Sequence, residues 1–201
     1  MKLFFISLGC DKNLVDSEQM LGMLAADGIS ITNDEREADI IVVNTCCFIG
    51  DAKEESIQTI LEMAEYKEKG NAKGLIVTGC LAQRYRDEIK KEIPEVDAIL
   101  GANSYDSIVD AVHKAAAGEA YENFKELTGL PNLRQTRMLT TGGHYAYLKI
   151  AEGCNKHCTY CVIPSVRGSY RSVPIEELLD QAEELASLGV KELILVAQET
   201  T

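Results

Sequence analysis

The 201-residue chain has no tryptophan, only three histidines and no long hydrophobic run. Its apolar segments are far shorter than the roughly 20 residues that a membrane-spanning helix needs, so we expect no membrane contact of that kind. Basic residues are a minority, since 20 Lys and Arg stand against 32 Asp and Glu, which gives a net charge of −12. Because binding to a phosphate backbone needs a basic surface, this charge argues against direct nucleic-acid binding and favours a basic partner.

Several familiar motifs are also missing. The chain contains no Walker loop, no G-x-G-x-x-G fingerprint and no G-x-S-x-G elbow. The apolar run at residues 3–6 is shorter than the roughly 7–15 residues of a secretory signal, which argues against export. We therefore expect a cytoplasmic protein, in which its seven cysteines serve metal binding or redox catalysis and do not form disulfides.

Strand and helix patterns alternate through the first part of the chain. Apolar runs without polar alternation predict strands that are buried on both faces, at residues 3–8, 40–43, 75–77 and 98–100. Apolar residues at helical spacing lie between these runs, and the last such helix ends at Gly118. We therefore expect an α/β domain over residues 1–118, with a parallel sheet covered by helices on both faces.

One helix of this domain carries more detailed expectations. Asp51 is placed to cap its N-terminus. Ile57, Ile60, Leu61 and Ala64 recur at helical spacing and should form one buried face.

A second pattern follows a segment that has no periodicity. Residues 119–143, which include Pro131, predict a linker. From residue 144 onward the sequence predicts a strand, a cysteine-rich loop, a helix that starts near Pro174 and another strand. Two strands and one helix cannot close a core alone, because a complete eight-fold βα barrel takes about 250 residues. Residues 144–201 are therefore expected to be the first units of a βα barrel in an incomplete chain.

The cysteine-rich loop is the strongest local signal. Cys154, Cys158 and Cys161 lie within eight residues directly after the predicted strand, and thiolates select zinc or an iron–sulfur cluster. His157 adjoins Cys158 and is poorly placed to reach the same metal. Three thiolates without an evident fourth ligand indicate an open coordination position, where chemistry can take place. The alternative is a structural zinc whose fourth ligand comes from elsewhere.

A second set of cysteines is dispersed in sequence. Cys10, Cys46 and Cys80 each follow a predicted strand. Because the carboxyl ends of parallel strands meet at one edge of a sheet, these three side chains should converge on a second three-thiolate site. Three buried structural cysteines are the alternative. Cys47 should point away from its neighbour and is interpreted as a bystander, with a redox role for the adjacent pair as the alternative.

Four other polar residues are worth locating in the structure. Arg167 and Arg171 follow the cysteine-rich loop and would either meet an anionic ligand or be solvated. His113 falls on a predicted helix and should lie at the surface, and His144 has no partner that the sequence identifies.

The C-x-x-x-C-x-x-C loop after a first barrel strand resembles that of the radical S-adenosylmethionine enzymes. Longer segments are similar to the methylthiotransferases within that group. They are residues 7–13 (SLGCDKN), 15–18 (VDSE), 44–49 (NTCCFI), 79–85 (GCLAQRY), 145–150 (YAYLKI) and 152–155 (EGCN). The resemblance covers nearly all of the chain.

Three features resemble the branch of this family that acts on a ribosomal protein. These are residues 11–13 (DKN), where the tRNA-modifying branch typically has Gln-Met-Asn, residues 48–49 (FI) and residues 197–201 (AQETT). Val173 and Glu199 depart from the Arg and Asp that the family more often has there. The resemblance implies methylthiolation of an aspartate β-carbon on small-subunit ribosomal protein S-twelve. A tRNA methylthiotransferase and a non-catalytic metal-binding or electron-transfer module are the alternatives.

The same resemblance implies cofactors and partners. One 4Fe–4S cluster would be held by Cys154, Cys158 and Cys161 and would bind S-adenosylmethionine, with Tyr160 against its adenine. A second 4Fe–4S cluster would be held by Cys10, Cys46 and Cys80 and would carry the sulfur to be inserted. The implied partners are a basic ribosomal protein and an electron donor.

Overall fold

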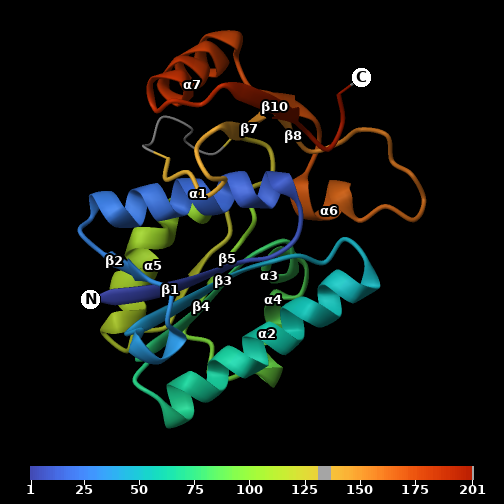
Figure 1. Ribbon diagram of the computed structural model, residues 1–201. Helices are drawn as coiled ribbons and strands as arrows, with labels where there is room; N and C mark the ends of the chain where they lie inside the picture. The colour runs from blue at the N-terminus through green and yellow to red at the C-terminus, as the bar shows by residue number, and fades with distance from the viewer. Residues whose placement is uncertain (131–136, 201) are drawn as a thin grey trace.

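The computed structural model describes residues 1–130 and 137–200, so the predictions for residues 131–136, with Pro131, and for Thr201 lie outside the described residues. A six-stranded parallel sheet forms the centre of the first part of the chain, in the order β2-β1-β3-β4-β5-β6 (Figure 1). Its strands are β1 (Lys2–Ser7), β2 (Ser30–Thr32), β3 (Ile40–Thr45), β4 (Gly74–Gly79), β5 (Ala98–Leu100) and β6 (Tyr121–Asn123).

Helices cover both faces of this sheet, as the sequence predicts. α1 (Asp11–Ala26) and α5 (Ile108–Ala116) lie on one face. The other face carries α2 (Gly50–Lys69), α3 (Cys80–Arg84) and α4 (Arg86–Glu92). Short 3-10 turns occur at Glu35–Glu37 and Tyr105–Ser107. The side chains of β3 alternate between two cores, because Ile40 and Val42 pack on the α1–α5 side while Ile41 and Val43 pack on the α2 side.

α2 differs from the expectation at two points. The residue before its first turn is Ile49, so Asp51 is not the cap and lies inside the first turn, where a carboxylate still favours the helix dipole. Ile60 and Ala64 are buried, but Ile57 and Leu61 are 38% and 44% exposed. Since α2 rests on the sheet along a narrow stripe, only two of the four predicted residues reach the core.

The sheet extends into the segment that the sequence analysis interprets as a linker. β6 pairs in parallel with β5, with Ala98 opposite Tyr121 and Leu100 opposite Asn123. Three residues are too few to show a periodicity in the sequence, and the side chains of β6 are only half-buried. The division of the chain into domains at residue 118 remains a prediction.

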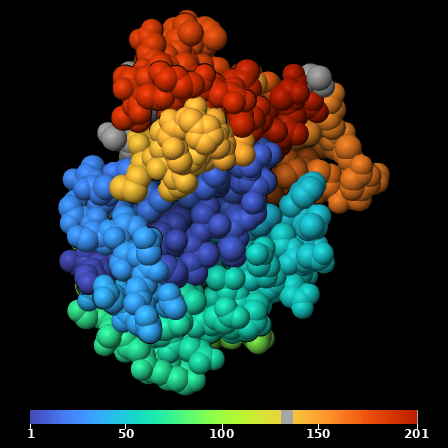
Figure 2. Space-filling view, in the orientation of Figure 1, coloured from blue at the N-terminus to red at the C-terminus, as the bar shows by residue number. Residues whose placement is uncertain are grey.

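The last part of the chain forms a smaller unit. β7 (Tyr145–Lys149) and β10 (Glu192–Val196) pair in parallel, and α7 (Ile175–Ser187) packs against β7. In the sequence between β7 and α7 come β8 (Ala151–Glu152), α6 (Ile163–Arg167) and β9 (Arg171–Ser172), and β8 pairs with β9 antiparallel. Figure 2 shows this unit resting on α1. Its core is small, and several apolar side chains of α7 and β10 are exposed, in agreement with an unclosed barrel.

No helix within the described ranges is both long enough and apolar enough to cross a membrane.

Candidate functional site

A cavity of about 680 Å³ lies at the carboxyl edge of the sheet, and Cys10, Cys46 and Cys80 all line it. Cys10 directly precedes α1, Cys46 follows β3 and Cys80 opens α3 after β4. The structure therefore brings together three cysteines that are up to 70 residues apart in the sequence. The strand ends of the sheet place them there, as the sequence predicts.

Two glycines permit this close approach. Gly9 and Gly79 both have a positive φ, of 91° and 93°, which side-chain-bearing residues rarely adopt. A Cβ atom on Gly9 would lie 2.7 Å from the Cβ of Cys46, and one on Gly79 would lie 2.6 Å from the carbonyl oxygen of Thr45. The turns that carry Cys10 and Cys80 therefore pack against the end of β3 only because both glycines lack a side chain.

Cys47 behaves differently from Cys46. Its thiol is buried, does not line the cavity and donates to the carbonyl oxygen of Cys80 at 3.3 Å. Burial, together with the nearby Cys80 and Cys46, raises the pKa of Cys47 to about 11. Cys47 is thus a neutral packed thiol, which agrees with its interpretation as a bystander.

The cysteine-rich loop lies between β8 and α6 and is shaped by Gly153. With a φ of 79°, Gly153 lies so close to the neighbouring segment that a Cβ atom there would meet the carbonyl oxygen of Ser169 at 2.1 Å. The amide of Cys154 donates to the carbonyl oxygen of Gly168 at 3.1 Å, and that of Cys161 donates to Cys158 at 3.0 Å. The thiol of Cys154 is buried, whereas Cys158 is exposed and Cys161 half-buried.

Tyr160 lies on the same loop, and its side chain is 91% exposed. The structure leaves the ring open to a ligand at the loop but packs it against none of the three cysteines. The assignment of Tyr160 to the adenine therefore stays a prediction.

The chemistry of both cysteine sets fits an iron–sulfur cluster. Within the part of the chain that the structure describes, no three Cys, His, Asp or Glu side chains are gathered tightly enough to hold a single metal ion. A cluster of four irons separates its thiolate ligands more widely than one ion does. Three cysteines around a roomy cavity, and three on one exposed loop, are donor sets of the soft kind that such a cluster takes.

A buried network of charges links α1 to the segments on either side of the cysteine-rich loop, and no sequence pattern predicted it. Arg167 donates to Asp16 at 2.7 Å and to the amide oxygen of Asn13 at 2.9 Å, and its guanidinium lies 3.4 Å from Glu152. Lys149 donates to the Asp16 carboxylate and, at 2.8 Å, to Glu152. Two cations and two anions are thus balanced out of contact with water.

This network joins the two parts of the chain. Asp16 and Asn13 belong to α1, whereas Lys149, Glu152 and Arg167 come from β7, β8 and α6. A second contact, in which Arg137 donates to Glu18 at 2.7 Å and to the carbonyl oxygen of Tyr147 at 2.6 Å, works in the same way. A lysine within the apolar strand at residues 145–150 was the sequence signal that could have revealed a buried partner.

Electrostatics keep the network ionised. Burial alone raises the pKa of Glu152, but the adjacent Lys149 and Arg167 more than offset this and hold it at about 2. Burial lowers the pKa of Lys149, yet Asp16 and Glu152 raise it well above its ordinary value. Both groups are therefore charged at any physiological pH.

Arg167 also reaches the cysteine set at the sheet edge, formed by Cys10, Cys46 and Cys80. Its Nε donates to the thiol of Cys80 at 3.3 Å. Burial raises the pKa of Cys80, and the guanidinium of Arg167 opposes that rise. The sequence left two interpretations of Arg167, contact with an anionic ligand or solvation. The side chain is not solvated, and the anions that it meets are Asp16 and Glu152 of its own chain.

The remaining polar residues have local roles. Arg171 donates to the carbonyl oxygens of Ser169 and Arg167. His113 is exposed on α5, as predicted, and lies 2.7 Å from Asp27. The ring of His144 packs edge-on against Tyr145.

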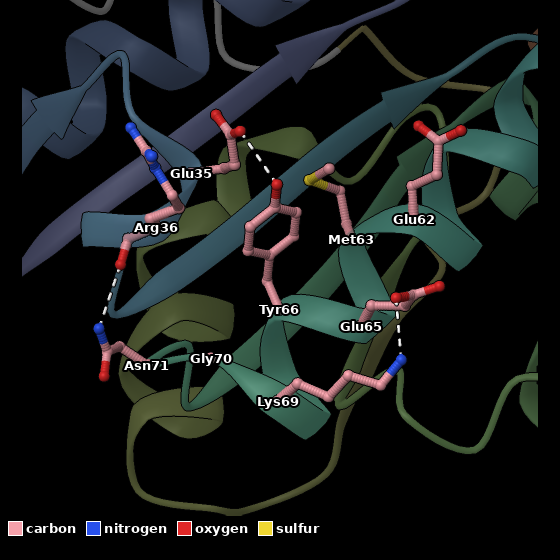
Figure 3. A pocket seen from close by; sticks show the side chains of 9 residues that line it. All are labelled: Glu35, Arg36, Glu62, Met63, Glu65, Tyr66, Lys69, Gly70 and Asn71. Carbon is pink, nitrogen blue, oxygen red and sulfur yellow. Dashed lines mark hydrogen bonds and ion pairs between the residues drawn. The ribbon is translucent and has the colours of Figure 1, made fainter.

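Another cavity, of about 630 Å³, is shown in Figure 3. It is lined by residues that precede β3 and β4, which places it at the opposite edge of the sheet. Several of its polar side chains already bond to each other, since Tyr66 donates to Glu35 at 3.0 Å and Lys69 donates to Glu65 at 3.0 Å. It has no thiol and no part in the cysteine chemistry.

Comparison with known proteins matches both parts of the chain. Residues 2–101 match the model of an uncharacterized protein family, UPF0004, and residues 148–201 match that of the radical SAM superfamily. The chain is 66% identical, over its whole length, to the "Ribosomal protein uS12 methylthiotransferase RimO" of Lachnoclostridium phytofermentans. It is 54% and 51% identical, again over its whole length, to proteins of the same name from Acetivibrio thermocellus and Clostridium tetani.

The chain is therefore similar, over its whole length, to radical S-adenosylmethionine methylthiotransferases. It spans about half the length of the curated relatives it matches, with 46%, 46% and 45% of those three proteins covered. For a methylthiotransferase of this kind, S-adenosylmethionine and 4Fe–4S chemistry are implied. The α/β sheet followed by the start of a radical SAM unit agrees with the predicted fold class.

Proposed function

We propose that the protein to which this chain belongs methylthiolates an aspartate β-carbon of small-subunit ribosomal protein S-twelve. The observation that carries the proposal is the gathering of Cys10, Cys46 and Cys80 around one cavity, next to a unit that carries the radical SAM loop. The names of the relatives support the same reaction. The reaction would take place in the cytoplasm, where ribosomes assemble.

The six cysteines divide between two clusters in this proposal. Cys154, Cys158 and Cys161 hold one 4Fe–4S cluster and leave one iron free for S-adenosylmethionine, with Tyr160 beside the adenine. Cys10, Cys46 and Cys80 hold the second. When bound, these groups supply a 5′-deoxyadenosyl radical, the inserted sulfur and the methyl group.

The chain's own residues prepare the site. Gly9, Gly79 and Gly153 let the three cysteine-bearing turns approach their neighbours. The buried charges of Asp16, Lys149, Glu152 and Arg167 hold the cysteine-rich unit against α1, which would orient the two cysteine sets relative to each other.

A protein substrate is favoured over tRNA by two observations. The net charge of −12 complements a basic ribosomal protein and repels a phosphate backbone. Residues 11–13 and 48–49 also resemble the ribosomal-protein branch. An electron donor is a further expected partner. Residues 1–118, 119–143 and 144–201 are the proposed domain, linker and barrel segments, with β6 of the linker segment added to the sheet of the first domain.

A deletion strain tests the substrate. Mass spectrometry of its ribosomal protein should show loss of the methylthio group, while its tRNA nucleosides stay unchanged. The opposite pattern would identify a tRNA methylthiotransferase.

Anaerobic reconstitution of the full-length protein with iron and sulfide tests the chemistry. About eight irons per chain and cleavage of S-adenosylmethionine are expected for two 4Fe–4S clusters. One zinc and no cleavage would instead identify a structural module.

A further inference from the structure

Arg167 is the one side chain that the structure shows touching both the buried charge network and a cysteine of the sheet-edge cavity, among the residues described. It belongs to α6, just beyond the cysteine-rich loop, while Cys80 belongs to α3 on the other part of the chain. The two lie 87 positions apart in sequence, and Nε of Arg167 lies 3.3 Å from the sulfur of Cys80. The Arg167 side chain is 3% exposed, and its bond to Cys80 is partly buried.

We propose that Arg167 is a positioning residue for the sheet-edge cluster, the one held by Cys10, Cys46 and Cys80. Arg167 holds Cys80 with a charge-assisted hydrogen bond and thereby raises the reduction potential of that cluster. The inference rests on the proposed function, in which Cys80 is a cluster ligand. Hydrogen bonds to ligand sulfurs and the net charge around a cluster set its potential, and reduction adds a negative charge. A buried cation that donates to a ligand sulfur therefore favours the reduced form.

The geometry suits arginine and no other cation. Two of its nitrogens are fixed by Asp16 at 2.7 Å and Asn13 at 2.9 Å, and these bonds aim the third, Nε, at Cys80. A guanidinium presents its donors in a rigid plane, so three partners can be served together. A lysine at this position has one nitrogen at the end of a flexible stem and would not reach Asp16, Asn13 and Cys80 at once.

A purely structural role is the competing explanation, because Arg167 also neutralises Asp16 and Glu152. A variant that keeps the charge balance of the network separates the two roles. The double variant Asp16→Asn/Arg167→Gln removes one anion and one cation together. Its matched reference is Asp16→Asn alone, which retains Arg167 and its bond to Asn13.

The experiment uses the full-length protein with Cys154, Cys158 and Cys161 all replaced by alanine, so that only the sheet-edge cluster can assemble. Iron content, the electron paramagnetic resonance signal and the midpoint potential are measured after anaerobic reconstitution, with melting temperature as the check on folding. Arg171→Gln serves as a second control, since Arg171 contacts backbone carbonyls and not Cys80.

We expect the midpoint potential of Asp16→Asn/Arg167→Gln to be more negative than that of Asp16→Asn, and Arg171→Gln to leave it unchanged. Equal midpoint potentials in the double variant and its reference would overturn the inference about Arg167. The proposal of a cluster on Cys10, Cys46 and Cys80 would then still stand. A double variant that loses both its iron and its melting temperature relative to Asp16→Asn would make Arg167 a structural residue only. Absence of iron from the parent protein would instead remove the second cluster, and with it the proposed function.

Discussion

Replacing Asp16 by alanine should destabilise the 201-residue chain strongly. Asp16 is 3% exposed and accepts hydrogen bonds from Lys149 and Arg167. Without it, two buried cations share the single carboxylate of Glu152. Removal of one partner from a buried ion pair typically costs about 3–5 kcal/mol, because an uncompensated charge stays buried.

That cost should be visible as a fall in melting temperature. For a chain of this size, about 1 kcal/mol lowers the midpoint by roughly 2–4 °C, so Asp16→Ala should lower it by about 6–20 °C. The double variant Asp16→Ala/Lys149→Met, which removes one charge of each sign, should recover part of the loss.

Glu37→Gln is the matched control for this measurement. Glu37 accepts from Lys2 at 2.6 Å, but both side chains are more than half exposed, and solvent-screened pairs of this kind contribute little to stability. Thermal melts followed by circular dichroism compare the variants. If Asp16→Ala loses no more than Glu37→Gln does, the network does not hold the two parts of the chain together.

Three further outcomes are expected. Because the pKa of Glu152 is held at about 2, below its ordinary 4.5, its ionised form stabilises the fold above pH 4.5, and this contribution is lost as the pH falls toward 2. Acid unfolding of Glu152→Gln should therefore lack the loss of stability between pH 4.5 and 2. An acid transition unchanged from that of the parent protein would contradict the assignment. Gly153→Ala should destabilise by about 1–3 kcal/mol, because its Cβ atom would meet the backbone of Ser169 at a positive φ, and urea melts will measure this; a neutral effect would show that the loop is free to shift. Residues 144–201 alone should be poorly ordered, since apolar side chains of α7 and β10 are exposed even in the longer chain; a cooperative melt of that fragment would refute this.

Local sequence patterns predicted the sheet because burial leaves a direct trace in them. Residues 40–43 are apolar without alternation, and their side chains do pack on both faces. The three dispersed cysteines were predicted for a similar reason, since each follows a strand and parallel strands end at one edge. β6 left no such trace, because it is three residues long and half-buried.

Lys149 hinted at a buried anion, but the partners within the charge network could not be predicted from the sequence. Asp16 is separated by 133 residues from Lys149 and by 151 from Arg167, and charged residues are usually solvated. Only the packing of α1 against β7, and of α6 against α3, brings these charges together. Asp51 failed as a cap because helix boundaries depend on backbone geometry that composition does not determine.

Separate quantification of deoxyadenosine and methylthiolated product tests most directly the claim that the two cysteine sets hold independent clusters. In the full-length enzyme under anaerobic turnover, Cys158→Ala should abolish deoxyadenosine formation, because the radical-generating cluster loses a ligand that it cannot replace. Cys46→Ala should keep deoxyadenosine formation and lose the product, while Cys47→Ala, whose thiol does not line the cavity, should keep both. Loss of deoxyadenosine in Cys46→Ala, or loss of product in Cys47→Ala alone, would contradict the account.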